Sequence, residues 1–128
     1  AWLGAVSRLV VDCNREAHAP GVIPIASDGH AIPGNRLDHE AHQARLARFY
    51  HPYHDGLAAL IAEHRPVMIL SLHSFTPMLA SHPGEQRPWE VGILYNRDDR
   101  LARTAIRWLS DAGWCVGDQQ PYSGRLLN

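Results

Sequence analysis

The stretch PVMILSLHSFTP, residues 66–77, decides how we interpret the fold. Its first seven residues are apolar apart from Ser71, a proline opens them, and a polar turn follows. A short apolar run between turn residues is typical of a strand buried on both faces of a sheet. His73 comes directly after it, and ligands of open α/β sheets bind beyond the carboxyl ends of the strands. We therefore weigh a functional histidine against one that merely caps a turn.

The composition is that of one globular domain. The chain has 128 residues, 45% of them hydrophobic, which is enough for an ordinary core. A net charge of -1 gives no electrostatic reason to expect nucleic acid. No apolar run approaches the roughly 20 residues needed to span a membrane. The two cysteines, Cys13 and Cys115, match neither a zinc pair nor a disulfide scaffold, so we expect a reducing, cytoplasmic location.

Strand and helix signals alternate along the chain. Besides residues 66–72, we expect strands at residues 6–12, 89–95 and 114–117, and helices at residues 39–61 and 99–112. Asp38 is a good N-cap for the first helix, and Pro52 within it predicts a kink or two consecutive helices. Residues 16–37 are rich in turn pairs and predict a long functional loop. This order predicts an α/β fold of three layers, with a mostly parallel, mixed sheet covered by helices on both faces.

Polar side chains follow three of the expected strands. They are Asn14 and Arg15 after the first, with Arg8 inside it, His73 and Ser74 after the second, and Asp118 and Tyr122 after the fourth. Arginine and asparagine bind carboxylates through charge-assisted hydrogen bonds, and a neutral imidazole binds metals. The pattern predicts a small anionic ligand beside a metal, provided that the first two strand ends open into one cleft.

Other patterns are less specific. His39 and His42, like His51 and His54, are one helical turn apart, but without a third ligand in register we expect solvated or rim histidines rather than a metal site. Arg100, Arg103 and Arg107 share one helix face, which favours an ordinary solvated surface over a phosphate site. Cys13 lacks a base partner that would make it a nucleophile.

Six motifs, in order, resemble the N-formylglutamate amidohydrolase family, from about Ser7 to the end of the chain. They are DCNR (12–15), SDG with IPGN (27–29 and 32–35), YHPYH (50–54), HSFTP (73–77), RPWEVG (87–92) and VGD with PYSG (116–118 and 121–124). The resemblance implies a zinc carboxypeptidase and aspartoacylase-like fold, phosphorylase/hydrolase-like in architecture. It also implies Zn²⁺-dependent release of formate from N-formyl-L-glutamate in histidine degradation.

The resemblance further implies roles for single residues. His73 matches a zinc ligand, Asn14 and Arg15 match the pair that binds the substrate carboxylate, and Arg8 matches the arginine that precedes them. The other zinc ligands are not found among the residues that the resemblance covers, and Gln119-Gln120 replace an asparagine and a glutamate of the family pattern.

The general base of the family is a glutamate that comes after the last expected strand. We expect it beyond Asn128, the last residue of the sequence, so no catalytic residue is assigned within residues 1–128. These departures lead us to expect a single, partial amidohydrolase domain over residues 1–128.

Two functions remain open from the sequence. The first is an enzyme that acts on a small acidic N-acyl amino acid, without a nucleic-acid or membrane partner. The second is a non-catalytic domain that binds an acidic amino acid or a partner chain without a complete metal site. His73 is the one zinc ligand that the resemblance assigns, and a catalytic zinc takes about three protein ligands. We therefore expect the 128 residues alone to show little hydrolysis of the N-acyl amino acid. The sequence assigns neither the acyl group nor the oligomeric state.

Overall fold

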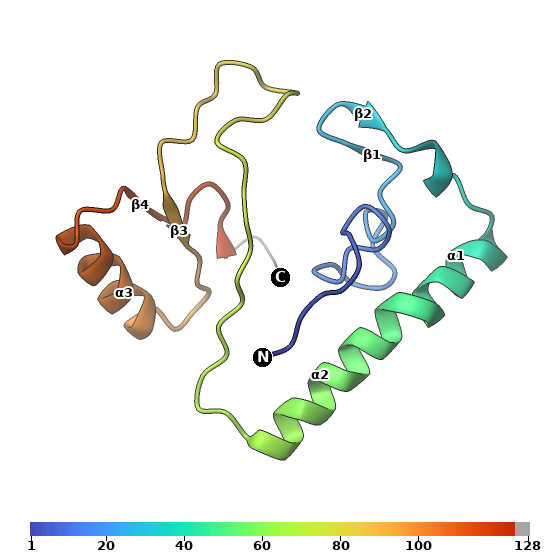
Figure 1. The fold of residues 1–128 in the computed structure, drawn as a ribbon, viewed down its shortest axis with the longest axis horizontal. Coiled ribbons are helices and arrows are strands. Elements are labelled where there is room, and N and C mark those ends of the chain that lie inside the picture. Colours follow the sequence, from blue (N-terminus) through green and yellow to red (C-terminus); the bar gives the residue numbers. More distant parts are fainter. Residues whose placement is uncertain (125–128) are drawn as a thin grey trace. The chain divides into compact units, whose positions relative to one another are not determined.

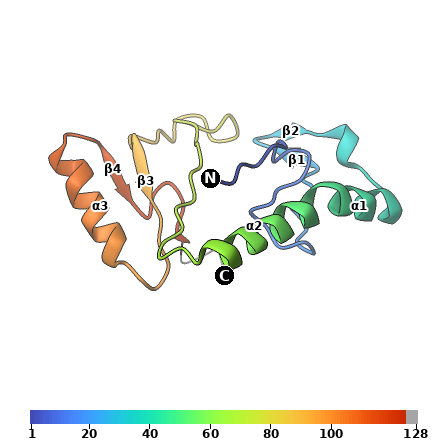
Figure 2. The same cartoon turned by 60° about the horizontal axis from the view of Figure 1, so that its bottom comes forward.

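The structure is a computed structural model and describes residues 1–124 (Figures 1 and 2). The chain divides into two compact units, residues 1–72 and 73–128, and each is described by itself. In chain order the elements are β1 (Ala26–Ser27), β2 (His30–Ala31), the 3₁₀ turn η1 (Pro33–Asn35), α1 (His39–Arg45), the π-helical turn η2 (Leu46–Tyr50), α2 (His51–His64), β3 (Val91–Ile93), α3 (Arg100–Asp111) and β4 (Val116–Asp118).

The core of the first unit joins the N-terminal segment to the long helix. Its buried members are Val11, Val22, Ile23, Leu46 and Tyr50. The backbone of Asp12 donates to the carbonyl of Val22 at 2.7 Å, which ties the N-terminal segment to the loop that follows it. These contacts fix the segment that carries Asn14 and Arg15 against the helix.

The helix of the first unit follows the sequence prediction closely. Asp38 is its N-cap, and the carboxylate accepts from the backbone N–H of Ala41 at 2.8 Å. Pro52 has no N–H to donate to the preceding turn, and the π-helical turn η2 lies just before it, followed by α2. The predicted interruption at Pro52 is thus confirmed as two α-helices joined by one π turn.

The expected long loop contains a small hairpin. Asp28 and Gly29 have φ angles of 46° and 80°, and a turn with positive φ at both central residues suits the twist of antiparallel strands. It joins β1 to β2, which pair antiparallel. Asn35 then holds this loop from a buried position, since its amide donates to the carbonyls of Leu9 and Pro24 at 2.6 and 2.7 Å.

The second unit is a strand–helix–strand arrangement. β3 and β4 pair in parallel, with Val91 opposite Val116, and α3 connects them. Among the described residues of α3, Ala102 is the buried one, whereas Leu101 and Trp108 are 55% and 75% exposed. The helix therefore packs through its Ala102 face, and Leu101 and Trp108 lie on its exposed side.

Two of the predicted strands are absent from the described residues. Residues 6–12 form a turn in which Val10 and Val11 both donate to the carbonyl of Ser7. Residues 66–72 contain no strand, and side chains predicted to be buried on both faces are instead exposed, from 51% at Met68 to 107% at Val67. The described strands pair as β1 with β2 and β3 with β4, so none of them is hydrogen-bonded to this segment.

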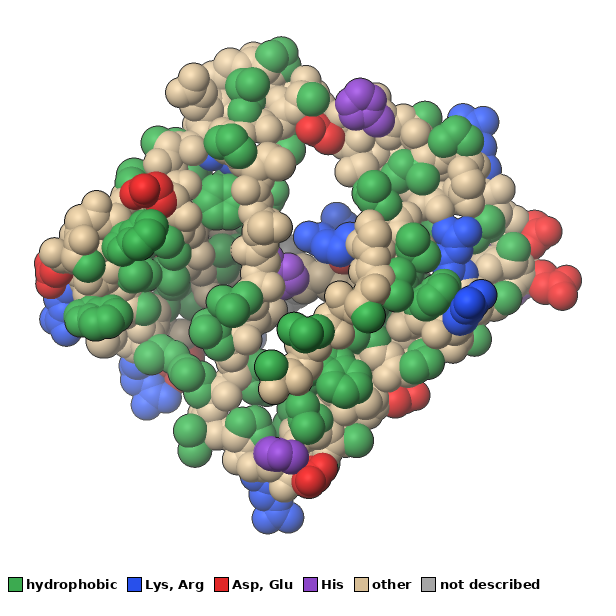
Figure 3. Space-filling view, viewed as in Figure 1, with side chains coloured by type: hydrophobic (Ala, Val, Ile, Leu, Met, Phe, Trp, Pro, Cys, Tyr) green, Lys and Arg blue, Asp and Glu red, His purple; other side chains and the backbone are tan. Residues whose placement is uncertain are grey.

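The α/β class is therefore confirmed, and the three-layer sheet is not. Residues 1–124 contain two sheets of two strands each, one antiparallel and one parallel. Hydrophobic side chains reach the surface of both units, as the space-filling view shows (Figure 3). In the part of the chain that the structure describes, no helix is long and apolar enough to cross a membrane.

Candidate functional site

A buried carboxylate organises the two arginines singled out in the first unit. The side chain of Asp12 is 7% exposed, and those of Arg8 and Arg15 are 57% and 55% exposed. Arg8 donates from Nε to Oδ1 at 2.9 Å and from Nη2 to Oδ2 at 2.7 Å, a bidentate pair. Nε of Arg15 lies 3.3 Å from the same Oδ2. The structure thus brings Arg8 and Arg15 together on one acidic residue.

The backbone around this cluster is also fixed. The N–H of Asn14 donates to Oδ1 of Asp12 at 3.0 Å, and the N–H of Arg15 donates to the carbonyl of Asp12 at 3.1 Å. The hydroxyl of Tyr50 donates to the carbonyl of Arg15 at 2.8 Å. Asn14 and Arg15 therefore sit on a tight turn anchored by a core tyrosine, with their side chains exposed to solvent.

The charge balance of the cluster favours an ionised Asp12. Burial opposes its ionisation, but hydrogen bonds from Arg8 and from the backbone of Asn14, with the charges of Arg8 and Arg15, hold its pKa below the ordinary 3.8. One carboxylate against two guanidinium groups leaves one net positive charge. The arrangement can attract one carboxylate group of a ligand.

Cys13 is not an activated nucleophile. Burial, and then the charge of neighbouring Asp12, raise the pKa of its thiol above 9.0. A reactive cysteine needs the opposite, a lowered pKa near positive charge. The sequence interpretation, which found no base for this cysteine, agrees with this environment.

His73 is the first residue of the second unit and lies outside any helix or strand. Its side chain is exposed, rather than placed at the end of a buried strand. Its role as a zinc ligand stays a prediction. The prediction that it follows a strand is wrong, because residues 66–72 are not paired within residues 1–124.

The general-base glutamate also stays a prediction. The resemblance puts it beyond Asn128, and Asn128 itself lies outside the residues that the structure describes. Within the described second unit, Glu90 accepts from the backbone N–H of Cys115 at 2.9 Å, a contact that joins the segments leading into β3 and β4. We therefore assign the general base to no residue from 1 to 124.

Polar groups at the end of β4 and in the loop that follows it make contacts inside the second unit. Asp118 accepts from the hydroxyl of Tyr95 at 2.8 Å and from Nη1 of Arg103 at 2.9 Å. The hydroxyl of Tyr122 accepts from Nη1 of Arg87 at 3.0 Å. Gln119, where the sequence departs from the family pattern, donates to the carbonyl of Tyr95 at 2.6 Å and so closes the loop. These groups stabilise the loop after β4.

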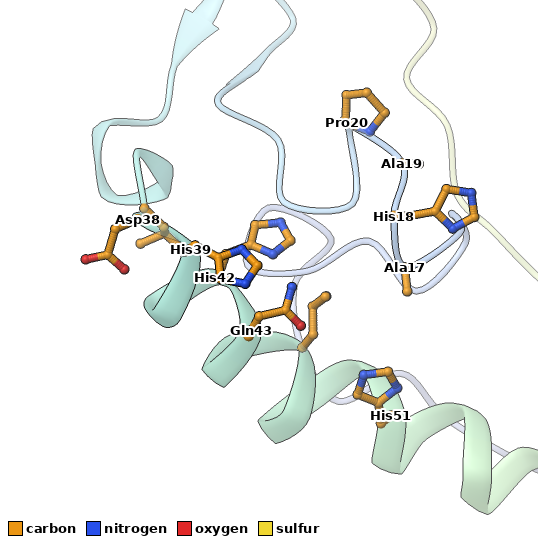
Figure 4. Close-up of a pocket in the computed structure, with 11 residues that line it drawn as sticks. Ala17, His18, Ala19, Pro20, Asp38, His39, His42, Gln43 and His51 are labelled. Atoms are coloured by element: carbon orange, nitrogen blue, oxygen red, sulfur yellow. The ribbon is translucent and has the colours of Figure 1, made fainter.

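A cavity of about 560 Å³ lies elsewhere on the first unit. Three of its histidines, His39, His42 and His51, come from the helix, and His18 comes from the facing loop (Figure 4). His39, His42 and His51 are thus rim residues, as expected. Across residues 1–124, no three His, Cys, Asp or Glu side chains are grouped closely enough to hold a metal ion.

His54, the partner of His51 in the sequence pattern, was also expected to be a solvated or rim histidine, and that prediction is wrong because its ring packs against two tyrosines. Its ring packs against Tyr50 and Tyr53, with ring centroids 4.3 and 5.3 Å away. Its Nε2 is buried without a hydrogen-bond partner in the described part of the chain. His51 and His54 therefore do not share a site.

Sequence reasoning identified the arginines but missed what positions them. Asp12 and Tyr50 were not singled out as site residues, although Asp12 stands in the same motif as Asn14 and Arg15. Gly21, where an added Cβ would lie 3.1 Å from Nε of Arg15, was not singled out either. The signal available was an acidic residue at the end of a valine-rich run, between two arginines. Nothing in the local sequence pairs Tyr50 or Gly21 with Arg15.

Comparisons with known proteins agree with the motif order. Residues 3–128 match the family model described as N-formylglutamate amidohydrolase. The crystal structure of gene product Atu2144 from Agrobacterium tumefaciens is similar, with 38% sequence identity and a TM-score of 0.82 over 91% of this chain. This chain spans 47% of the length of that structure, about half. No curated protein matched.

The family match covers almost the whole chain and includes both units. It also includes the cluster of Arg8, Asn14 and Arg15 around Asp12, and it includes His73. The chain belongs to the N-formylglutamate amidohydrolase family.

Proposed function

We propose that this chain is part of an enzyme that hydrolyses a small acidic N-acyl amino acid, with N-formyl-L-glutamate as substrate and formate and L-glutamate as products. This is a reaction of histidine degradation. The observation that carries the proposal is the cluster of Arg8, Asn14 and Arg15 around Asp12, in a chain that matches the family from residue 3 to residue 128. The cluster supplies the positive charge that an acidic substrate requires.

The substrate carboxylate binds at Arg15 and Asn14 in this proposal, with Arg8 beside them. Both Nη atoms of Arg15 make no hydrogen bond within residues 1–124, and its side chain is 55% exposed. A guanidinium with two N–H groups on one edge matches the two oxygens of a carboxylate. The side-chain amide of Asn14 is exposed and adds a further hydrogen-bond donor. The backbone N–H of Asn14 donates to Asp12, which fixes the position of this residue.

Zinc is the cofactor that the family resemblance implies, with His73 as one ligand. The described residues of neither unit gather three donors, so they do not form a ready metal site, and we derive no reaction step through the metal. We also propose a cytoplasmic location for the enzyme, supported by Cys13 and Cys115, which form no disulfide. In the whole enzyme, the three-layer sheet predicted from the sequence remains our proposed architecture, and a glutamate beyond Asn128 remains our proposed general base.

The second candidate is a ligand-binding domain without catalysis. The absence of a three-donor group among residues 1–124 favours it for this chain by itself. The two candidates share the carboxylate site and differ only in turnover.

Calorimetric titration with N-formyl-L-glutamate, followed by a formate-release assay with added zinc, tests both. We expect saturable binding and little release from the 128-residue chain. Zinc-dependent release that His73→Ala removes would show that the chain is itself catalytic. Binding without release leaves the binding domain as the function of this chain, and the absence of saturable binding contradicts both candidates.

A further inference from the structure

We propose that Asp12 is a positioning residue of the carboxylate site, one that orders Arg8 and Arg15 as a single unit, and that Gly21 is the residue that leaves room for Arg15. This inference rests on the proposed function, since it assigns how the ligand-binding arginine is held. The motif resemblance gives neither residue a role.

The two arginines contact Asp12 in different ways. Arg8 uses both Nε and Nη2 on Asp12, at 2.9 and 2.7 Å, whereas Arg15 approaches it through Nε alone, at 3.3 Å. Arg8 therefore makes a bidentate pair with the carboxylate of Asp12. Arg15 keeps its terminal nitrogens for a ligand, and Asp12 restrains the angle at which it presents them.

Restraint of Arg15 comes from three sides. Besides Asp12 at Nε, Tyr50 holds its carbonyl at 2.8 Å. On the third side, a Cβ at Gly21 would lie 3.1 Å from Nε and 3.3 Å from Cδ and Cζ of Arg15. Such distances are tighter than ordinary contacts, so the Arg15 side chain must move by a few tenths of an ångström when position 21 carries a Cβ.

Charge alone predicts the opposite result from positioning, which makes the inference testable. Asp12 opposes anion binding electrostatically, so its neutralisation raises the net charge of the cluster from +1 to +2 and favours a carboxylate ligand. If Asp12 positions the arginines, its neutralisation weakens binding instead, because the guanidinium groups lose their common acceptor. The sign of the change in Kd separates the two effects.

The experiment is calorimetric titration of N-formyl-L-glutamate into the wild type and into Asp12→Asn, Gly21→Ala and Gly34→Ala variants. We expect Kd to rise about tenfold or more in Asp12→Asn, the scale of one charge-assisted hydrogen bond. In Gly21→Ala we expect a rise of about threefold without a change in Tm, because a displaced guanidinium misaligns the ligand without loss of a core contact. Gly34→Ala is the matched control, since a Cβ there meets nothing within 4 Å, and its Kd stays at the wild-type value.

A second readout does not depend on the ligand. The Nε–H signals of Arg8 and Arg15 in ¹H–¹⁵N spectra report their contact with Asp12, and we expect Asp12→Asn to shift both while Gly34→Ala leaves them in place. Wild-type affinity in both Asp12→Asn and Gly21→Ala, or tighter binding in Asp12→Asn, overturns the positioning role and leaves the proposed function intact. A wild-type chain that binds nothing contradicts the proposed function, and the Nε–H signals then decide the positioning role by themselves.

Discussion

The Asp12 cluster and the segment of residues 66–72 are two of the three places where the sequence predicted a polar strand end, and they differ in how much of their environment the chain supplies. Around Asp12, burial, two guanidinium groups and a fixed backbone turn all come from residues 8–50. Around residues 66–72, the apolar side chains are exposed, and no strand within residues 1–124 pairs with them. The contacts that hold the Asp12 cluster all come from the first unit, whereas a buried strand at residues 66–72 would need sheet neighbours that residues 1–124 do not pair with it.

This difference also separates the two halves of the proposed chemistry. Carboxylate binding needs only the charged groups of the first unit, which are in contact with one another. Metal binding needs three donors in one place, and residues 1–124 do not gather them. The comparison predicts that ligand binding is more robust in this chain than catalysis.

The largest expected effect contrasts a leucine from each kind of environment. Leu46→Ala, at a residue 3% exposed, should reduce the free energy of unfolding by about 2–4 kcal/mol, since it leaves a cavity in the core. Leu70→Ala, at a residue 69% exposed, should change it by less than about 0.5 kcal/mol. Urea denaturation measures both. Equal losses would show that residues 66–72 are buried, as the sequence alone suggested.

The next effect concerns ligand affinity. Arg15→Ala should weaken binding of N-formyl-L-glutamate by about 1.5–3 kcal/mol, because a charge-assisted pair with the carboxylate is lost. Arg107→Ala removes the same charge from an exposed position on α3 and serves as the control. Calorimetry that finds the same affinity in both variants argues that the ligand responds to overall charge and not to this site.

The smallest effect is a pH dependence of stability. The folded-state pKa of Asp12 lies below its ordinary value of 3.8, so its contribution to stability is present above the unfolded pKa and is lost as pH falls through the folded pKa. One such group changes stability by at most about 1.4 kcal/mol per pH unit. Urea midpoints measured from pH 6 to pH 2 should show a larger acid loss in the wild type than in Asp12→Asn. Parallel curves for the two proteins would contradict the ionised, paired state of Asp12.

Local signals in the sequence predicted the elements that local forces determine. The Asp38 cap, the interruption at Pro52 and the end of α3 before Gly113 all follow from backbone chemistry within one or two turns. Residues 66–72 have the composition of a buried strand, but pairing is decided by distant segments that composition does not specify. Prediction therefore worked for the helices and the β3–α3–β4 unit and not for the first two strands.

The candidate site shows the same limit. Arg8, Asn14 and Arg15 could be selected because their chemistry suits a carboxylate, whichever contacts they make. Asp12 could have been selected from its place between two arginines, but its burial could not. The closeness of Arg15 to Gly21 depends on how residues 12–22 fold back, which the sequence does not specify. The sequence likewise did not show that Asp118 accepts hydrogen bonds from Tyr95 and Arg103.

The most direct test of the carboxylate site is a ¹H–¹⁵N spectrum recorded while N-formyl-L-glutamate is added to the wild-type chain. The account predicts saturable shifts of the Asn14 amide and of the Arg15 Nε–H, and no such shifts with the neutral diamide of the same compound. Shifts confined to the histidine-lined cavity around His18, His39 and His42, or equal shifts with the diamide, would contradict it.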